Sequence, residues 1–577
     1  ERCILCARCT RFSDEISGDP LIEFIQRGNK TEVNTFPNEP FKSYFSGNTV
    51  QICPVGALTS TSYRFKARPW DLKSTRSTCN GCPTGCSIEL NSSQNKMLRI
   101  LGVDNDAVNQ GWMCDKGRYN FEYLNSDSRL KTPLKMTDNE LVEIEIQDVY
   151  SELTEFIKDR QTKVNFLLGS NLTNEDYVAF REFSKTISQS ERSFYLNDDL
   201  LYKGFFGDNI ELAKIDDLNS SDAIVVWAED LKEKLPVLYL RIRQAVKNGV
   251  KLVVFGHTNE TLSDIADVFY GKDMVSENFE ILKDLSKMKE INNLVVGKNI
   301  TAILGKSTPY QSDESVTKLF EFLNSNANSK VLNAYSKGNT YGAFQILENL
   351  KGLNDFVNDI SKDNTDLLFI VGADPIGRSV YSNQIKSIIK SINTVVTLDN
   401  FNHETSELSD YVVPISSTLG EKEGTFTNIE FRTSRIEKLV PSPGQTVSDW
   451  EFITSLMNFA GLKAEANSLE DLNRKAYENL DSSLSPVFDN LDKPSNLDGM
   501  INISKPKIST SENKLNKTMF FTGEKLYGDS ATERHSDSIS MLGSKKFIEV
   551  SESVAEKYNL TSGSCTLTQD ELEVTVN

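Results

Sequence analysis

Eight of the nine cysteines in this 577-residue chain lie within the first 114 residues, at regular spacings. Cysteines that act only as small buried hydrophobic residues would be scattered along the chain. Disulfide frameworks are typical of small secreted domains, and this chain is much longer than such a domain. The pattern therefore indicates thiolate ligands for metal, and the spacing can be used to ask which metal.

The opening segment, ERCILCARCTRF, has the spacing C-x2-C-x2-C. Such a loop offers three thiolates for a [4Fe–4S] cluster, whose fourth ligand is a distant cysteine that is often followed by proline. Cys53 fits that role because it precedes Pro54, which fixes φ and turns the chain away. In a two-cluster ferredoxin run the next cysteine would fall at Ser13, so this run serves one cluster. We predict one [4Fe–4S] cluster with the ligands Cys3, Cys6, Cys9 and Cys53.

A second set of cysteines has the spacing C-x2-C-x3-C-x27-C, within STCNGCPTGCSIEL and GWMCDKGRYNF. Gly85 allows a tight backbone before the third cysteine, since glycine can adopt positive φ. Four cysteines can also hold one structural zinc, although zinc sites more often use two separated C-x2-C pairs. We predict a second [4Fe–4S] cluster, with zinc as the alternative; its ligands are Cys79, Cys82, Cys86 and Cys114.

Four segments resemble one known family. They are CILCARCTRF, SGNTVQICPVGALTS, RPWDLKSTRSTC and NQGWMCDKGRYNFEYLNSDSRLKTPL. The family is the large iron–sulfur subunit of bacterial respiratory complex I, the 75 kDa type of NADH–quinone oxidoreductase subunit. The resemblance covers most of the chain and is densest over residues 1–135. It implies an N-terminally truncated fragment, with a [2Fe–2S] and a further [4Fe–4S] cluster bound upstream. It also implies that the second cluster is an extra one of some bacterial members, which points to a prokaryotic source.

The resemblance also implies a role. In this family NADH is oxidised on a flavin in a neighbouring subunit, and electrons then pass through clusters toward quinone. The chain would be an electron-transfer subunit with no catalytic residue of its own. Its first cluster resembles a relay on the main path, and its second resembles a side cluster off that path. The implied partners are the other peripheral-arm subunits, including the flavin-binding subunit, at the cytoplasmic side of the bacterial inner membrane.

Composition excludes two other classes of partner. The net charge of −19 disfavours binding to nucleic acid, which would be repelled. No apolar run approaches the roughly 18 residues that span a bilayer, so we expect no direct membrane insertion. Three arginines flank the first cysteine set and would raise a cluster's potential by favouring its reduced form; alternatively they are solvated or paired with acids. They are Arg2, Arg8 and Arg11.

From about residue 130 to residue 500, short apolar runs alternate with helical patterns. The apolar runs occupy 163–170, 222–230, 250–257, 299–307, 366–375 and 393–400, and clear helical patterns follow at 173–188 and 235–249. Short β-branched runs that end in Gly or Asp, each followed by a helix, are typical of parallel sheets covered on both faces. The fold class is therefore α/β and multidomain, with doubly wound parallel sheets.

Parts of this body resemble molybdopterin oxidoreductases. The loop VGADPIGRS, ending at Ser379, resembles one that holds a pterin dinucleotide, and the stretch around Glu423 and Asn428 also resembles that superfamily. The last segment is turn-rich and resembles the superfamily's C-terminal β-barrel, cut before its end. We predict four parts: 1–65, the end of a ferredoxin-like [4Fe–4S] region; 66–130, a molybdopterin-oxidoreductase-type [4Fe–4S] domain; 131–500, molybdopterin-oxidoreductase-like α/β domains; and 501–577, a barrel-like segment.

Two other functions remain open. A molybdopterin-dependent enzyme of formate dehydrogenase type would commonly ligate its metal through Cys, selenocysteine or Ser. No cysteine lies between Cys114 and Cys565, and we expect no molybdopterin. Lys116 resembles a lysine that links cluster to pterin in those enzymes, and without pterin we expect it to be a structural hydrogen-bond donor. A scaffold with zinc in both sites is the second alternative. The three histidines match no metal or nucleophile pattern, so we expect surface or loop positions for them; they are His257, His403 and His535.

Overall fold

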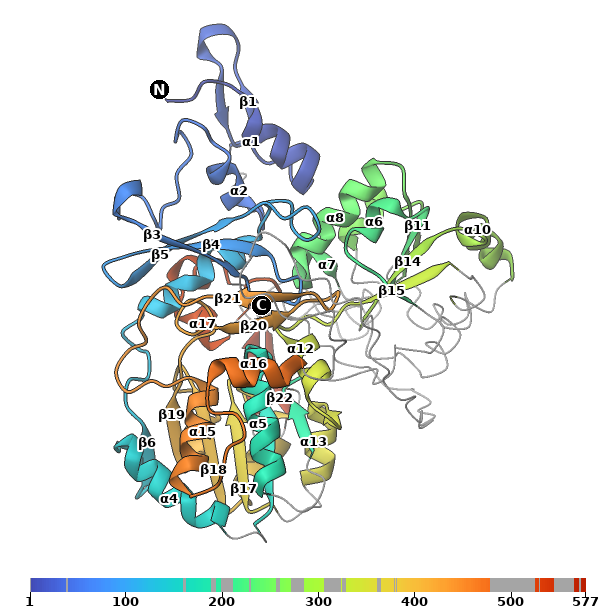
Figure 1. Cartoon of the computed structure of the whole chain (residues 1–577). Helices are drawn as coiled ribbons and strands as arrows, with labels where there is room; N and C mark the ends of the chain where they lie inside the picture. The colour runs from blue at the N-terminus through green and yellow to red at the C-terminus, as the bar shows by residue number, and fades with distance from the viewer. Residues whose placement is uncertain are drawn as a thin grey trace.

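The structure is a computed structural model of the whole chain, and it describes most of the first 477 residues and a few later segments. The described residues are 2–37, 40–158, 162–187, 193–198, 211–227, 230–255, 260–270, 285–305, 323, 328–360, 365–377, 379, 381–477, 525–528, 530–543, 565–569 and 572–576. Figure 1 shows a small N-terminal part at the top, above two α/β units.

The N-terminal part contains short elements joined by irregular chain. In order these are α1 (Arg8–Arg11), the π-helix η1 (Phe12–Ser17), β1 (Glu23–Ile25), η2 (Gly28–Lys30), β2 (Glu32–Asn34) and α2 (Ser46–Gln51). Strands β1 and β2 form an antiparallel pair. Helix α1 packs against both η1 and α2, which brings the two cysteine-bearing segments of this part together.

A three-stranded antiparallel sheet follows, in the order β3-β4-β5. Its elements are η3 (Pro69–Asp71), β3 (Lys73–Thr78), β4 (Ser87–Ser93) and β5 (Lys96–Gly102), followed by α3 (Asp115–Tyr119) and η4 (Asn120–Asn125). The loop between β3 and β4 carries three cysteines of the second set, and the fourth immediately precedes α3. The three-stranded sheet and α3 therefore position the four cysteines of that set.

The larger α/β unit is built on an eight-stranded sheet in the order β16-β9-β8-β17-β18-β19-β6-β7. Its strands are β6 (Leu134–Thr137), β7 (Glu140–Glu143), β8 (Val164–Leu168), β9 (Phe194–Leu196), β16 (Leu350–Lys351), β17 (Leu367–Val371), β18 (Thr394–Asp399) and β19 (Tyr411–Pro414). The six strands from β16 to β19 are parallel, whereas β6 and β7 are added antiparallel at one edge. The prediction of a parallel sheet is confirmed for this central part.

The smaller α/β unit is inserted within the larger one. Its six parallel strands have the order β10-β15-β14-β11-β12-β13. They are β10 (Glu211–Leu212), β11 (Ala223–Trp227), β12 (Lys251–Phe255), β13 (Val268–Tyr270), β14 (Ile300–Leu304) and β15 (Ser329–Asn333), with the helices α6 (Asp217–Ser220), α7 (Leu231–Lys234), α8 (Pro236–Lys247), η5 (Glu260–Ile265) and α10 (Leu285–Val295). The chain thus leaves the larger sheet after β9 and returns to it at β16.

Helices cover both faces of the larger sheet, and successive side chains of each strand enter different cores. Phe166 packs on one face with α5, whereas Leu167 faces the core that contains α13 and α14. The helices are α4 (Ile146–Lys158), α5 (Asn174–Ile187), α12 (Thr340–Ile346), α13 (Leu353–Ile360), α14 (Ser382–Ile389), η7 (Ser406–Leu408), α15 (Asp449–Phe459) and α16 (Leu469–Tyr477). Burial on both faces explains why these strands are continuous apolar runs.

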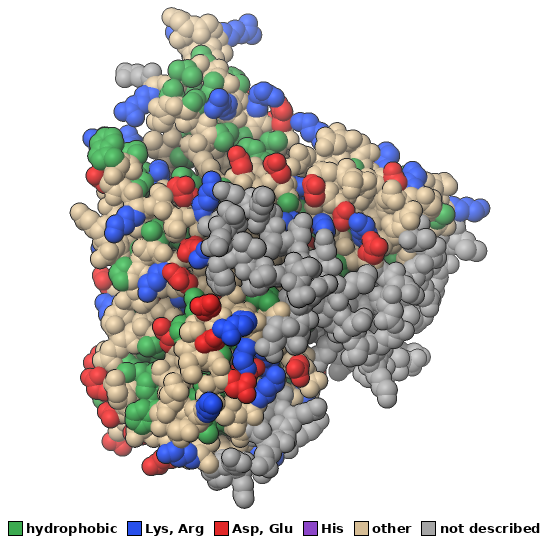
Figure 2. Space-filling view, in the orientation of Figure 1, with side chains coloured by type: hydrophobic (Ala, Val, Ile, Leu, Met, Phe, Trp, Pro, Cys, Tyr) green, Lys and Arg blue, Asp and Glu red, His purple; other side chains and the backbone are tan. Residues whose placement is uncertain are grey.

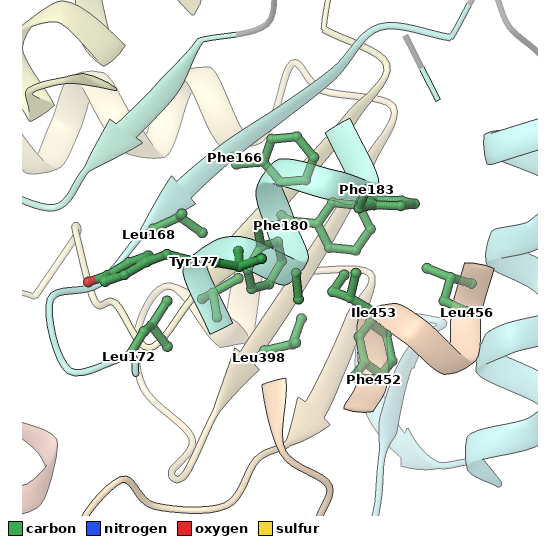
Figure 3. Packing of buried hydrophobic residues seen from close by; sticks show 14 of the residues in the cluster. Phe166, Leu168, Leu172, Tyr177, Phe180, Phe183, Leu398, Phe452, Ile453 and Leu456 are labelled. Atoms are coloured by element: carbon green, nitrogen blue, oxygen red, sulfur yellow. The ribbon is translucent and has the colours of Figure 1, made fainter. Parts of the chain in front are cut away.

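The aromatic core beside α5 shows the packing most clearly (Figure 3). The Phe166 ring is fully buried and stacks on Phe369, with the ring centroids 5.7 Å apart. Phe180 and Phe183 from α5 and Phe452 from α15 complete this layer. Burial of each such ring contributes about 1.5–3 kcal/mol, so this cluster stabilises the packing of α5 and α15 on the sheet.

The C-terminal barrel-like prediction is not confirmed. The described residues there form α17 (Ala531–Arg534), α18 (Asp537–Ser540) and an antiparallel pair of β22 (Cys565–Gln569) and β23 (Leu572–Val576), and residues 501–524 lie outside the described part. A further antiparallel pair, β20 (Gly424–Thr427) with β21 (Thr433–Ile436), packs near β3. Among the described helices, none is long and apolar enough to cross a bilayer.

Candidate functional site

The second cysteine set converges where the β3–β4 loop meets the start of α3. Cys79 donates its backbone N–H to the carbonyl of Cys86 at 2.9 Å, which closes the loop. Gly85 adopts φ of +63°, as predicted, and a Cβ there would lie 2.9 Å from that of Asn428. A Cβ on Gly117 would lie 3.1 Å from Cys79 Sγ and 3.6 Å from Cys114 Sγ, so sulfurs from both segments meet above the first turn of α3.

These thiols lie in an environment that disfavours charge unless a cation is present. Burial raises the pKa of Cys79 to about 12, and the neighbouring Cys82 sulfur adds to that rise. Burial also raises the pKa values of Cys86 and Cys114, and the other sulfurs of the set raise them further. The Gly117 N–H donates a hydrogen bond to Cys114 Sγ at 3.4 Å, which favours the thiolate of that residue. Buried thiolates that repel one another need bound metal to compensate their charge.

The first cysteine set lies closer to solvent. Cys3 and Cys6 are exposed, and Cys9 and Cys53 are partly buried. Burial raises the pKa of Cys9, and the charges of Cys3 and Cys6 add to that rise, so these three sulfurs lie near one another. Leu5 adopts φ of +54° between the first two cysteines, in the left-handed region that non-glycine residues seldom occupy.

Cys53 lies in a different electrostatic environment. Partial burial raises its pKa, but the backbone N–H groups of residues 55–58 outweigh that effect and lower it. The chain after Pro54 therefore turns so that several amides point at the sulfur, which is the arrangement that stabilises a cluster-bound thiolate. Helix α1, which carries Cys9, contacts α2, which ends two residues before Cys53.

The spacing of the sulfurs can be compared with what each candidate metal needs. Within the described part of the chain, no group of three or more His, Cys, Asp or Glu side chains is close enough to hold a single metal ion. Structural zinc requires four ligands in a compact tetrahedron, whereas a [4Fe–4S] cluster is held by four more widely separated thiolates. Four buried or half-buried cysteine sulfurs, as in the second site, supply the ligand number that either a [4Fe–4S] cluster or a structural zinc ion needs.

A buried clamp joins the two cysteine-bearing regions. The Asp115 carboxylate, adjacent to Cys114, accepts hydrogen bonds from the backbone N–H of Ser46 at 2.9 Å and of Gly47 at 2.8 Å. The Arg118 guanidinium donates to Asn48 Oδ1 at 2.8 Å, so α3 contacts the first turns of α2 directly. This clamp was not recognisable from the sequence, because its partners are about 70 residues apart and none belongs to a metal-binding pattern.

A cavity of about 400 Å³ lies beside the second set, between it and the strand ends of both α/β units. Its wall includes Cys82 and Lys116 on one side and the loops after β8, β17 and β18 on the other. Lys116 Nζ lies 2.6 Å from Glu533 Oε1, and the Glu533 side chain is fully buried. The expectation that Lys116 has a structural role is consistent with this ion pair, which also holds α17 against the cavity.

The loop after β17, at 372–377, resembled a pterin dinucleotide loop in sequence. In the structure the Ile376 N–H donates to Thr405 Oγ1 at 3.3 Å, and the Gly377 N–H donates to Asp374 Oδ1 at 3.1 Å. Two amides that could face a phosphate are thus already paired. These residues do not fit a phosphate-bearing cofactor, so no step involving pterin is assigned to this chain.

His403 was expected on the surface or in a loop, and it lies in a loop. Its side chain is nevertheless only 1% exposed and fits between Asp374, which follows β17, and Asp399, the last residue of β18. Nδ1 lies 3.4 Å from Asp374 Oδ1, and Nε2 lies 3.2 Å from Asp399 Oδ2. Burial lowers the pKa of His403, but the two carboxylates outweigh it and raise the pKa to about 10. His535 is half-buried and stacks on Phe401, and His257 lies outside the described residues.

This arrangement predicts a pH-dependent stability. Because the fold favours protonated His403, its contribution is complete below the unfolded pKa of about 6.5 and is lost as the pH rises toward 10. We expect the difference in free energy of unfolding between the wild type and His403→Gln to shrink by about 3–5 kcal/mol from pH 6 to pH 10. Urea titrations at several pH values measure this difference.

His535→Gln is the matched control for that experiment. Burial lowers the pKa of His535, so the wild-type contribution at this position should grow, not shrink, as the pH rises through 6.5. If the His403→Gln difference stayed constant from pH 6 to pH 10, the charged pairing of His403 with the two carboxylates would be wrong.

Family profiles match almost the whole described body. The profile named molybdopterin oxidoreductase matches residues 129–459, which is more than half of the chain. The chain belongs to the molybdopterin oxidoreductase family. The profile of the molybdopterin oxidoreductase Fe4S4 domain matches residues 72–126, and that of the ferredoxin-like domain of NADH-quinone oxidoreductase subunit 3 matches residues 1–59. These matches support iron–sulfur clusters in both cysteine-bearing regions of this family member.

Curated relatives have names from respiratory complex I. A subunit of the NADH-quinone oxidoreductase of Mycobacterium bovis is 38% identical over 258 residues, which is 43% of this chain and 32% of that protein. The NADH-ubiquinone oxidoreductase 75 kDa subunit of Reclinomonas americana is 26% identical over 504 residues, covering 82% of this chain and 70% of that protein. The predicted resemblance to the large iron–sulfur subunit is thereby confirmed.

A third relative has another name. NADPH-Fe(3+) oxidoreductase subunit alpha of Geobacter sulfurreducens is 24% identical over 548 residues, covering 79% of this chain and 64% of that protein. The NADH-quinone oxidoreductase subunits of Mycobacterium and Streptomyces, by contrast, are matched over only about a third or less of their own length. The electron donor, the acceptor and the partner proteins of this chain are therefore matters for proposal.

Proposed function

We propose that the chain is an electron-transfer subunit of NADH–quinone oxidoreductase, in which each cysteine set holds one [4Fe–4S] cluster. The convergence of the second set above α3 is the observation that carries the proposal. The ligands of the first cluster are Cys3, Cys6, Cys9 and Cys53, and those of the second are Cys79, Cys82, Cys86 and Cys114. When bound, such a cluster accepts and releases single electrons.

The chain's own residues have three tasks in this proposal. The thiolates bind iron, and the amides near Cys53 and the Gly117 N–H stabilise the sulfur charge. The contacts of Asp115 and Arg118 with α2 fix the two sites relative to one another. Of the arginines near the first set, Arg11 pairs with Glu15 at 2.8 Å, which weakens the idea that it tunes a potential.

The proposal also covers the partner subunits, the cellular location and the roles of the different parts of the chain. The partners would be the other peripheral-arm subunits of complex I, including the flavin-binding subunit, at the cytoplasmic side of the bacterial inner membrane. Residues 1–65 and 66–130 would be the two cluster-binding parts, and the α/β body from residue 131 would be a scaffold without substrate chemistry or molybdopterin. Upstream residues of the longer protein would hold a [2Fe–2S] and a further [4Fe–4S] cluster.

The two clusters should differ in importance for turnover. Replacement of Cys82 by Ser should cost stability more than NADH–quinone turnover, because the second cluster lies off the proposed main path but fills a buried space between β3, β4 and α3. We expect the variant complex to keep at least about half of its turnover while its thermal unfolding midpoint falls by several degrees. Loss of turnover in a fully assembled Cys82→Ser complex would contradict the off-path position.

Complementation tests the proposed function as a whole. Membranes of a strain that lacks this gene should have no NADH–quinone turnover and should regain it with the full-length wild-type gene. The same membranes should be assayed with NADPH and ferric iron, and with formate and an artificial acceptor. Restoration of either of these activities without NADH–quinone turnover would overturn the proposal in favour of the corresponding alternative.

A further inference from the structure

Two large aromatic side chains project into solvent from the loop that connects the two cysteine-bearing regions. Phe65 is 91% exposed and Trp70 is 79% exposed, and no other Phe or Trp in the described part of the chain is as exposed. Single exposed hydrophobic residues are common on protein surfaces. Two such large side chains, both this exposed and within six residues of each other, are less common. Each leaves about 150–250 Å² of surface in water that a contact could bury.

The loop is anchored to β5 through Tyr63, which lies two residues before Phe65. Arg99 of β5 lies over the Tyr63 ring, 4.5 Å from its centroid, and the Tyr63 hydroxyl donates to the carbonyl of Ala67 at 3.2 Å. Phe65 itself has φ of +64°, a left-handed conformation that costs about 1–2 kcal/mol for a non-glycine residue. Phe65 is thus exposed to solvent in a conformation that costs stability, instead of being packed against the rest of the protein.

The charge around the loop is opposite to that of the whole chain. Residues 60–76 contain five Lys or Arg and a single Asp, whereas the chain as a whole has a net charge of −19. All five of these cations are exposed, and the Arg64 guanidinium lies 4.8 Å from the centroid of the Phe65 ring. On the face shown in Figure 2, Lys and Arg side chains gather over the N-terminal part of the molecule.

We propose that Phe65 and Trp70, with the basic side chains between and beside them, are a docking surface for an acidic patch on a different protein. Trp and Arg are enriched among the residues that dominate binding energy, and a basic surface selects an acidic partner by charge complementarity. A second copy of this acidic chain would be repelled at long range. The proposal concerns binding alone, so it can hold whichever electron donor and acceptor the complex uses.

Site-specific photo-crosslinking in the native assembly tests the docking surface. Trp70→p-benzoylphenylalanine is introduced into the full-length protein in its own cells, the assembly is purified and irradiated, and crosslinked peptides are identified by mass spectrometry. We expect crosslinks to one other protein, at a segment of net negative charge. Crosslinks only to this chain, to a second copy of it, to lipid, to nucleic acid or to a basic segment would overturn the proposal, as would the absence of crosslinks.

Two controls separate docking from chance contact. Phe459→p-benzoylphenylalanine places the same probe on α15, where the wild-type side chain is 50% exposed, and should not crosslink to that protein. Arg64→Glu with Lys66→Glu should lower the yield from position 70 at least about fivefold, whereas Lys390→Glu with Lys438→Glu should not. Unchanged iron content and circular dichroism show that the charge-reversed protein is folded. An unchanged crosslink yield in that protein would contradict the proposal that its basic side chains attract an acidic segment of the partner.

Discussion

Replacement of Cys6 by Ser should remove the first cluster and abolish most NADH–quinone turnover in the assembled complex. The residue is the central member of the C-x2-C-x2-C run, and its sulfur is one of three that lie together in the exposed opening loop. Serine oxygen is a poor substitute for thiolate as an iron ligand, so the cluster should be lost or become labile. We expect turnover to fall at least about tenfold and iron content to fall by about four per chain.

Cys565→Ser is the matched control, since this cysteine lies in β22 and belongs to neither set. It should leave both iron content and turnover unchanged. Turnover is compared at equal complex content, judged from the stoichiometry of the co-purified subunits, so that failed assembly is not mistaken for a broken relay. A Cys6→Ser complex with normal subunit content and normal turnover would show that the first site is not on the electron path.

The largest expected effect on stability is at Lys422, which is buried between two carboxylates. Its Nζ lies 2.6 Å from Asp176 Oδ2 and 2.5 Å from Asp449 Oδ2, and all three side chains are at most 2% exposed. Burial lowers the pKa of Lys422, but the two carboxylates outweigh it and raise the pKa above its usual value. Lys422→Met leaves two buried acids without their cation, and we expect the free energy of unfolding to fall by about 3–5 kcal/mol.

A second substitution tests whether charge is the cause. Burial raises the pKa of Asp449 to about 7 even with the lysine present, so Asp449→Asn removes a carboxylate whose charged form burial disfavours. Lys422→Met with Asp449→Asn should therefore recover part of the stability lost in Lys422→Met alone. The exposed Lys390→Met should change stability by no more than about 0.5 kcal/mol. Urea unfolding at pH 7 measures all of these variants, and equal losses for the single and double variants would contradict an electrostatic origin.

Local patterns predicted the strands of the body well. The apolar run at 163–170 contains β8, the run at 366–375 contains β17, and the helical pattern at 173–188 contains α5. These segments are buried on both faces or amphipathic, so their residue types alone specify the element. Strand order was beyond such reasoning, because no residue between β9 and β16 marks the inserted sheet as a separate unit. The antiparallel edge strands β6 and β7 were also not anticipated.

The candidate site was predictable where spacing carried the information and unpredictable where it depended on distant contacts. The cysteine sets and Gly85 follow from short-range pattern, and the structure gives Gly85 the positive φ that was expected. The burial of His403 was not predicted, because Asp374 follows β17 and Asp399 ends β18, and only the parallel sheet brings these strand ends together. Asp115 and Glu533 were missed for the same reason, since each meets a partner that is distant in the sequence.

Metal and sulfide analysis of the full-length protein, purified without oxygen, is the most direct test of the central claim. Two [4Fe–4S] clusters in the first 114 residues require about eight irons and eight sulfides, in addition to those of any upstream domain. Paired Cys6→Ser and Cys82→Ser variants should each lose about four of both, with no molybdenum or tungsten in any sample. A colourless protein with about two zincs and no iron, or iron content that neither substitution changes, would contradict the assignment of these eight cysteines.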